Sequence, residues 1–299
     1  MPELVVLVNP TAGRGRAARL VEPVLARLRA AGAAVTAEAG RDAEEAAALA
    51  RRAVDRGVDS LVVIGGDGMI HLAVQALAGS STTLGVIPAG TGNDLARALG
   101  IPRHDPMAAA DLVVARLRRT IDLGWTGETW FSTVLCAGID SRVAERVSGM
   151  RWPPGRLRYH LATVAEVRDL RPREYRIRLG DPADSTDLEL GGLLVAVGNT
   201  SSYGGGQLIC PNADPADGKL DVVVAEAMRL RELVPLFLQL QQGRHLAHSK
   251  ISWYRTGSVR IEAEQMSVYA DGELLGPPPV TIEARAAALR VFAPGGAPD

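Results

Sequence analysis

The chain has 299 residues, a net charge of −1 and only two cysteines. The balanced charge excludes a general attraction to nucleic acid or anionic membranes, and two cysteines cannot form a disulfide framework. No run of about 18 apolar residues predicts a bilayer-spanning segment, and the first residues lack the basic and apolar regions of a signal peptide. We therefore expect a cytoplasmic protein with two domains.

The first third of the chain alternates short apolar runs with amphipathic helical patterns. The runs predict strands at Leu4–Val8, Ala33–Glu38, Ser60–Ile64 and Leu84–Ile87. The helical patterns predict a first helix that ends near Ala31, followed by helices at Ala43–Arg56, Met69–Leu77 and Asn93–Leu99. Apolar strands that alternate with helices are typical of a parallel sheet covered by helices on both faces.

After Arg119 the pattern changes to short β-rich runs with turn residues between them. Strands are predicted at Trp130–Cys136, Glu174–Leu179, Gly192–Gly198, Lys219–Val224, Ser258–Ile261, Ser267–Tyr269, Val280–Glu283 and Ala288–Phe292. Two helical patterns, Leu157–Leu170 and Arg229–Gln242, interrupt them. This pattern of short strands predicts an antiparallel sandwich or barrel-like second domain. We therefore expect an α/β domain at 1–122 and a mainly β domain at 123–299.

Three glycine-bearing turns follow successive predicted strands of the first domain: NPTAG at 9–13, GGDG at 65–68 and PAGTGND at 88–94. Such turns expose backbone N–H groups at a helix N-terminus, which favours an anion. One turn alone is weak evidence, because α/β folds turn corners in this way without a ligand. Three at the carboxyl edge of one sheet predict a nucleotide or polyphosphate site.

Asp67 within GGDG has two interpretations. An acid among bare backbone next to phosphates favours a bound cation such as Mg²⁺. Alternatively, Asp67 caps the helix that follows it. The familiar nucleotide signatures GxxxxGK[ST] and GxGxxG are absent, so a ligand here would be held by a different kind of loop.

The blocks NPTAGRG (9–15), IGGDG (64–68) and IPAGTGNDLARALGIP (87–102) resemble the catalytic domain of diacylglycerol kinases, YegS-type lipid kinases, and sphingosine and ceramide kinases. NAD kinases share the GGDG turn. CAGIDSRV (136–143), GNTSSYGGGQLICPNADPADGKLDVVV (198–224) and YADGELLG (269–276) resemble the lipid kinases in the second domain, which disfavours an NAD kinase. The resemblance covers essentially the whole chain.

The resemblance implies that the first domain binds ATP and that the active site lies in a cleft between the domains. The implied nucleotide-binding residues are Asn9, Pro10, Thr11, Ala12, Gly13, Gly65, Gly66, Asp67, Gly68, Met69, His71 and Thr91. Asp67 is expected to act on the nucleotide phosphates through Mg²⁺. Phosphoryl transfer otherwise needs alignment, charge neutralisation and a group that orients the attacking hydroxyl.

The resemblance also implies roles for two acidic segments of the second domain. Glu273 is expected to be the base that takes the proton from the lipid hydroxyl, with Asp271 supporting it; the alternative for Asp271-Gly272-Glu273 is an ordinary hairpin turn. Asp214, Asp217 and the carbonyl of Lys219 match a structural Mg²⁺ site. The alternative for that loop, PNADPADGKLD, is a solvated turn.

The sequence departs from the family pattern directly after GGDG. The family has Thr, Asn and Glu where this chain has Met69, His71 and Leu72. Met and Leu cannot make the hydrogen bonds of those polar side chains, and His71 can replace only part of them. We therefore expect an ATP- and Mg²⁺-dependent lipid kinase, and the alternative is a weakened member that binds nucleotide or lipid without efficient turnover.

The expected substrate is a diacylglycerol-like or sphingoid lipid at a membrane surface, to which the protein is at most peripherally bound. The stretch 142–178 contains ten arginines and four acids, which favours either an anionic membrane or a solvated helix and strand face. No nucleic-acid partner is expected, and the resemblance allows a homodimer.

Overall fold

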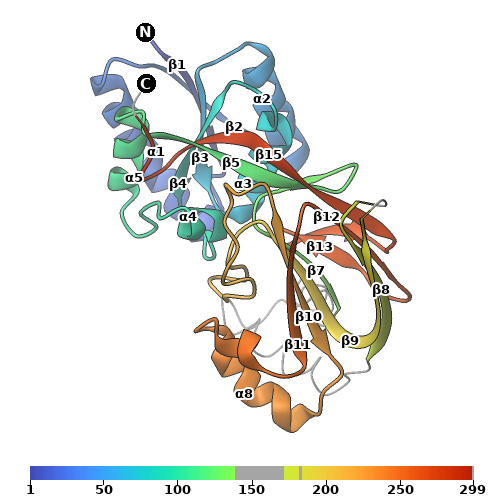
Figure 1. Ribbon diagram of the computed structural model, residues 1–299. Coiled ribbons are helices and arrows are strands. Elements are labelled where there is room, and N and C mark those ends of the chain that lie inside the picture. The colour runs from blue at the N-terminus through green and yellow to red at the C-terminus, as the bar shows by residue number, and fades with distance from the viewer. Residues whose placement is uncertain (139–171, 182–183, 298–299) are drawn as a thin grey trace. The chain divides into compact units, whose positions relative to one another are not determined.

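The computed structural model describes residues 1–138, 172–181 and 184–297, which divide into two compact units (Figure 1). The first unit comprises Met1–Leu123 and the chain from Ala286 onward, and the second comprises Gly124–Arg285. The predicted second domain, 123–299, differs from this division at its end. Strand β15 (Val280–Phe292) begins in the second unit and ends in the first, where Val291 lies opposite Leu84.

The first unit contains the predicted parallel sheet. Its strands are β1 (Glu3–Val8), β2 (Ala34–Ala39), β3 (Ser60–Gly65) and β4 (Thr83–Pro88), in the order β15-β4-β3-β1-β2. Every residue of β3 and β4 is buried, as expected of parallel strands that are covered on both faces. A further strand, β5 (Arg118–Trp125), pairs with β15.

Helices connect these strands. They are α1 (Ala12–Ala30), α2 (Ala43–Asp55), α3 (Asp67–Leu77), α4 (Asp94–Ala98) and α5 (Pro106–Val114). Helix α1 packs with α5, and α2 packs with α3. The sequence pattern did not predict α5, although Asp105 caps it by accepting the backbone N–H groups of Met107 and Ala108.

The second unit is antiparallel. Its strands are β6 (Trp130–Phe131), β7 (Val134–Gly138), β8 (Arg173–Leu179), β9 (Thr186–Gly198), β10 (Leu220–Glu226), β11 (Ile251–Thr256), β12 (Ser258–Ala263), β13 (Val268–Ala270) and β14 (Glu273–Gly276). The first half of β9 pairs with β8, and its second half pairs with β7 and β10. Strand β9 therefore joins two layers of a sandwich.

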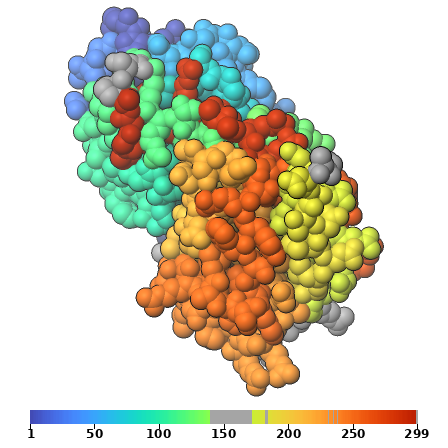
Figure 2. Space-filling view, viewed as in Figure 1, coloured from blue at the N-terminus to red at the C-terminus, as the bar shows by residue number. Residues whose placement is uncertain are grey.

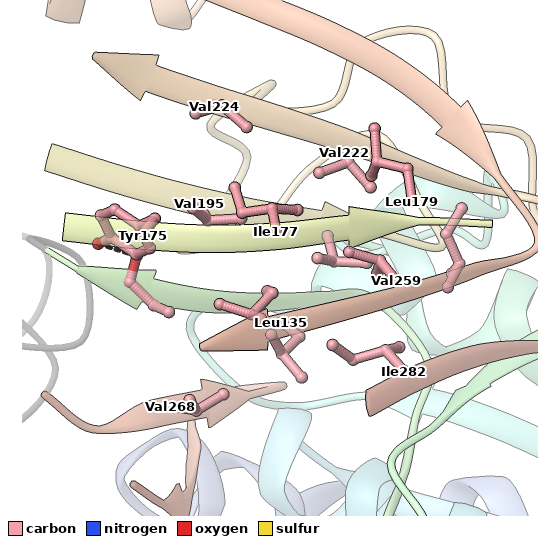
Figure 3. Close-up of a cluster of buried hydrophobic side chains, with 14 of the residues drawn as sticks. Leu135, Tyr175, Ile177, Leu179, Val195, Val222, Val224, Val259, Val268 and Ile282 are labelled. Carbon is pink, nitrogen blue, oxygen red and sulfur yellow. Dashed lines mark hydrogen bonds between the residues drawn. The ribbon is translucent and has the colours of Figure 1, made fainter. Parts of the chain in front are cut away.

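Side chains of both layers form one apolar core (Figure 3). Leu135, Val195 and Val222 come from one layer, and Ile177 and Val259 come from the other. This arrangement confirms the predicted antiparallel sandwich. Residues on the opposite face of β7, β9 and β10 belong to a second cluster, which explains why these strands are continuous apolar runs instead of alternating ones.

Helix α8 (Leu230–Leu240) confirms the second helical pattern and is followed by the 3-10 helix η1 (Arg244–Ala247). The predicted helix at Leu157–Leu170 lies outside the described residues. Among the helices that are described, none combines the length and the hydropathy needed to cross a bilayer.

Candidate active site

The turn after β1 is fixed by the side chain of Asn9. Its Oδ1 accepts hydrogen bonds from the backbone N–H of Thr11 at 3.1 Å and from the Thr11 hydroxyl at 2.8 Å. The backbone N–H of Asn9 donates to the carbonyl of Ile64 at 3.1 Å. The turn is thereby attached to the end of β3, directly before the GGDG turn.

Glycines let the three predicted turns approach one another closely. Gly13 has φ +59°, and a Cβ atom at this position would overlap the carbonyl oxygen of Ala89. A Cβ atom on Gly90 would lie 2.5 Å from the Cα atom of Gly66. The turns after β1, β3 and β4 thus meet backbone to backbone at the carboxyl edge of the sheet, as the sequence predicted. A glycine-rich edge of this kind lets the backbone approach a phosphate group closely.

Asp67 connects two of these turns. Its carboxylate accepts the backbone N–H groups of Asn93 at 2.8 Å and Asp94 at 2.7 Å. It therefore holds the start of α4, whereas the N-cap of α3 is Gly66. The helix-capping alternative was wrong about which helix is capped. A role of Asp67 at a nucleotide-bound Mg²⁺ stays a prediction.

Replacing Asp67 with Ala should release the turn that precedes α4, because two backbone N–H groups would lose their acceptor. We expect a loss of about 1–3 kcal/mol in the free energy of unfolding and faster amide hydrogen exchange at Asn93 and Asp94. Asp105→Ala, which removes an ordinary cap at α5, is the matched control and should leave exchange at 93–94 unchanged. Unaltered protection of these two amides in Asp67→Ala would contradict the role assigned to the carboxylate.

Sequence reasoning did not single out Asn93, the other residue that shapes this turn. Asn93 is buried and has φ +52°. Its Oδ1 accepts the backbone N–H of Gly90 at 3.2 Å, and its Nδ2 donates to the carbonyl of Gly90 at 3.0 Å. Asn tolerates the left-handed region better than most residues, so its place in the TGND segment was the available signal.

The remaining predicted nucleotide-binding residues differ in exposure. Met69 and His71 are buried, at 6% and 8% exposure, and Met69 packs against Gly65, where a Cβ atom would lie 2.8 Å from that of Met69. The exposed members of the set are Pro10, Thr11, Gly13, Gly68 and Thr91, while Asn9, Ala12, Gly66 and Asp67 are partly exposed. The exposed backbone of the turns is thus accessible, and two of the unusual side chains belong to the core beneath them.

In the second unit, Asp271 and Gly272 form the two-residue loop between β13 and β14. Both have positive φ, +52° and +89°, and Ala270 pairs with Glu273 across the turn. The segment therefore forms a hairpin turn, and the role of Glu273 as a base stays a prediction. Glu273 is exposed at the start of β14, where it is accessible to a substrate.

The hairpin also has a specific polar anchor. The Asp271 carboxylate accepts four hydrogen bonds: from the backbone N–H and hydroxyl of Ser132 at 2.9 and 3.2 Å, and from the backbone N–H and hydroxyl of Thr133 at 2.8 and 2.6 Å. Ser132 and Thr133 are buried. No sequence signal predicted this pair, because they lie 138 and 139 residues from Asp271. A carboxylate that is held by four donors positions its neighbour and is poorly suited to accept a proton itself.

Asp214, Asp217 and Lys219 lie in the loop before β10. Asp214 accepts the backbone N–H of Ala216 at 3.1 Å, and Asp217 accepts that of Lys219 at 2.9 Å. Within residues 1–138, 172–181 and 184–297, no group of three or more His, Cys, Asp or Glu side chains is arranged to hold a metal ion. The Asp217 carboxylate instead faces the guanidinium of Arg255 at 3.3 Å, as does Asp221 of β10 at 2.8 Å.

Two family profiles match the chain. Residues 3–126 match the diacylglycerol kinase catalytic domain, and residues 133–293 match the YegS C-terminal NAD kinase beta sandwich-like domain. A diacylglycerol kinase of Mycobacterium tuberculosis (strain ATCC 25618 / H37Rv) is 43% identical over 298 residues, which cover 98% of this chain and 95% of the relative. A diacylglycerol kinase of Bacillus subtilis (strain 168) is 31% identical over 275 residues, or 91% and 89% of the two chains.

Solved structures agree with the fold. A crystal structure from Bacillus anthracis str. Sterne has a TM-score of 0.83 at 25% identity and covers 98% of this chain and 97% of that one. A diacylglycerol kinase structure from the same strain has a TM-score of 0.75 at 22% identity, with the same coverage. At 22% identity, the second structure shows a shared fold and nothing more.

Proposed function

Because the chain belongs to the diacylglycerol kinase family, as a YegS-like member and a lipid kinase, we propose that it transfers the γ-phosphoryl group of ATP to the hydroxyl of a diacylglycerol-like or sphingoid lipid. The observation that supports this function most strongly is the 43% identity, across 98% of the chain, to a diacylglycerol kinase. A diacylglycerol is accordingly the first substrate to test.

We assign nucleotide binding to the first unit. Backbone N–H groups at the three glycine-bearing turns would receive the phosphates, and Asn9 and Asp67 would keep those turns in place through the hydrogen bonds described above. Mg²⁺ bound to the nucleotide would neutralise the charge that develops on the phosphates. Mg²⁺ prefers carboxylate and phosphate oxygens as ligands, which is the chemical reason for placing Asp67 at such an ion.

We assign activation of the lipid hydroxyl to the second unit. Glu273 would accept its proton as the oxygen attacks the γ-phosphorus, and the bond from that phosphorus to the β-phosphate oxygen would break. Asp271 would position Glu273, since its own carboxylate is held by Ser132 and Thr133. The roles of the two acids therefore differ because their surroundings differ.

The test is phosphoryl transfer by the wild-type protein. Radiolabelled ATP, Mg²⁺ and mixed micelles of diacylglycerol, sphingosine or ceramide should give a labelled phospholipid, and NAD should give no labelled product. Nucleotide binding with no transfer to any of these lipids would contradict the proposal and would favour the weakened member.

The alternative of a weakened family member rests on Met69 and His71, which stand where the family has polar residues. Since both side chains are buried, we expect Met69→Thr with His71→Asn to change turnover per folded molecule less than about 3-fold, while core packing costs about 1–3 kcal/mol of stability. Turnover should be normalised to the folded fraction measured by near-UV circular dichroism. A 10-fold or larger rise, by contrast, would mean that the natural loop is catalytically impaired.

We further propose that the protein reaches its lipid at a membrane surface and is peripheral to it. Most of the arginine-rich stretch that motivates this proposal, 142–171, lies outside the described residues. Arg176 and Arg178 are described, and they pair with Glu189 at 3.2 Å and Asp187 at 2.8 Å. Those two arginines support the solvated-face interpretation for β8.

A further inference from the structure

The side chain of Arg255 contacts three residues of an acidic loop in the second unit, residues 212–221. The Arg255 Nε donates to Asp221 Oδ1 at 2.8 Å, and its Nη1 lies 3.3 Å from Asp217 Oδ2. Its Nη2 donates to the carbonyl of Asn212. The guanidinium therefore contacts the beginning, middle and end of residues 212–221, and Figure 2 shows this light orange segment beside the orange β11.

The geometry of the sheet explains why Arg255 is placed there. Asp221 on β10 and Arg255 on β11 are directly opposite in the antiparallel register, an arrangement in which opposite charges stabilise the pair. The side chain of Asp221 is 2% exposed, whereas that of Arg255 is 36% exposed. A buried carboxylate needs a cation or several donors, and here the neighbouring strand supplies the cation.

The surroundings of Arg255 are adapted to a permanent positive charge. The hydrogen bond with Asp221 raises the pKa of the guanidinium, burial opposes this, and the charges of Asp221, Asp217 and Asp214 add to the increase. The guanidinium carbon also lies 5.6 Å from the ring centroid of Trp253, within the range of a cation–π interaction.

The same contacts leave this loop poorly suited to Mg²⁺. The resemblance implied an ion held by Asp214, Asp217 and the Lys219 carbonyl. In the structure, one oxygen of Asp217 accepts the Lys219 N–H and the other faces Arg255. An ion bound at Asp217 would lie within a few ångströms of the guanidinium, where two positive charges repel each other.

We propose that Arg255 is the cation of this loop, that it takes the place of the structural Mg²⁺ implied by the family resemblance, and that the wild-type second unit therefore needs no divalent ion to be stable. The inference is independent of the lipid substrate. It predicts that removal of the arginine, which leaves buried Asp221 and nearby Asp217 without their guanidinium partner, creates a response to divalent ions that the natural protein lacks.

The experiment measures the thermal midpoint of the full chain without nucleotide, in excess EDTA and in millimolar MgCl2, with NaCl added to equalise the ionic strength. The wild-type midpoint should be the same in both solutions. Arg255→Ala should lower the midpoint in EDTA by about 5–10 °C, and MgCl2 should restore at least about 2 °C of this loss by binding to the folded state. Arg255→Gln, a milder change, serves the same comparison if the Ala variant does not fold.

Arg260→Ala is the matched control. Arg260 lies on β12, is similarly exposed and pairs with Glu262 at 2.8 Å, but it does not contact the acidic loop in the described structure. Its replacement should shift the midpoint by less than about 2 °C in either solution. The proposal is overturned if MgCl2 raises the wild-type midpoint and Asp217→Asn abolishes that rise, or if Arg255→Ala matches the wild type.

Discussion

Glu273→Gln should remove nearly all kinase activity and leave the stability of the protein unchanged. Gln has the size of Glu but cannot accept the proton of the lipid hydroxyl, so we expect kcat to fall by roughly 10²–10⁴-fold. Glu273 is exposed, and a substitution at such a position changes the free energy of unfolding by only about 0.5 kcal/mol or less. Initial rates with radiolabelled ATP and diacylglycerol micelles, together with thermal unfolding, measure the two quantities.

Glu264→Gln is the control for this variant. Glu264 is another exposed glutamate of the second unit, so its change should leave both kcat and the thermal midpoint close to wild-type values. If Glu273→Gln retains more than about one tenth of wild-type kcat, a loss too small for a removed general base, another group takes the proton and the assignment is wrong.

Asp271→Ala should have the largest effect on stability. It removes the acceptor of four hydrogen bonds and leaves two buried backbone N–H groups and two buried hydroxyls without it. We expect urea unfolding to show a loss of about 3–5 kcal/mol. The folded fraction should also lose roughly 10²-fold in kcat, because the hairpin that carries Glu273 would no longer be held in place.

Asp187→Ala provides the contrast. Asp187 is also a hydrogen-bond acceptor, for the Arg178 guanidinium at 2.8 Å, but its side chain is 61% exposed. Because exposed ion pairs contribute little, we expect a loss of at most about 1 kcal/mol and no change in kcat. Equal stability losses in the two variants would show that the burial of Ser132 and Thr133 does not matter, contrary to the expectation.

Asp271→Asn separates positioning from folding. An amide can still accept hydrogen bonds through its oxygen, but its NH2 group would face a donor. Stability should therefore lie between those of wild type and Asp271→Ala. If Asp271 itself were the base, Asp271→Asn would lower kcat by roughly 10²–10⁴-fold, and Glu273→Gln would stay active.

The sequence by itself determined the architecture of both units and the location of the three glycine-bearing turns. Buried parallel strands, as at β3, must be apolar on both faces, and glycines such as Gly13 and Gly90 must stand where backbones touch. These requirements are local, so they are visible as patterns along the chain. The Asp-Gly pair at 271–272 likewise predicted a hairpin from its own backbone preferences.

Only the tertiary structure decided what the acids do, because their partners are distant in sequence. Asp67 holds Asn93 and Asp94, Asp271 holds Ser132 and Thr133, and Asp217 faces Arg255. A carboxylate can cap a helix, bind a metal, anchor a hairpin or accept a proton, and its residue type does not distinguish these roles. The donors or cations that surround it distinguish them, and the fold alone brings those groups together.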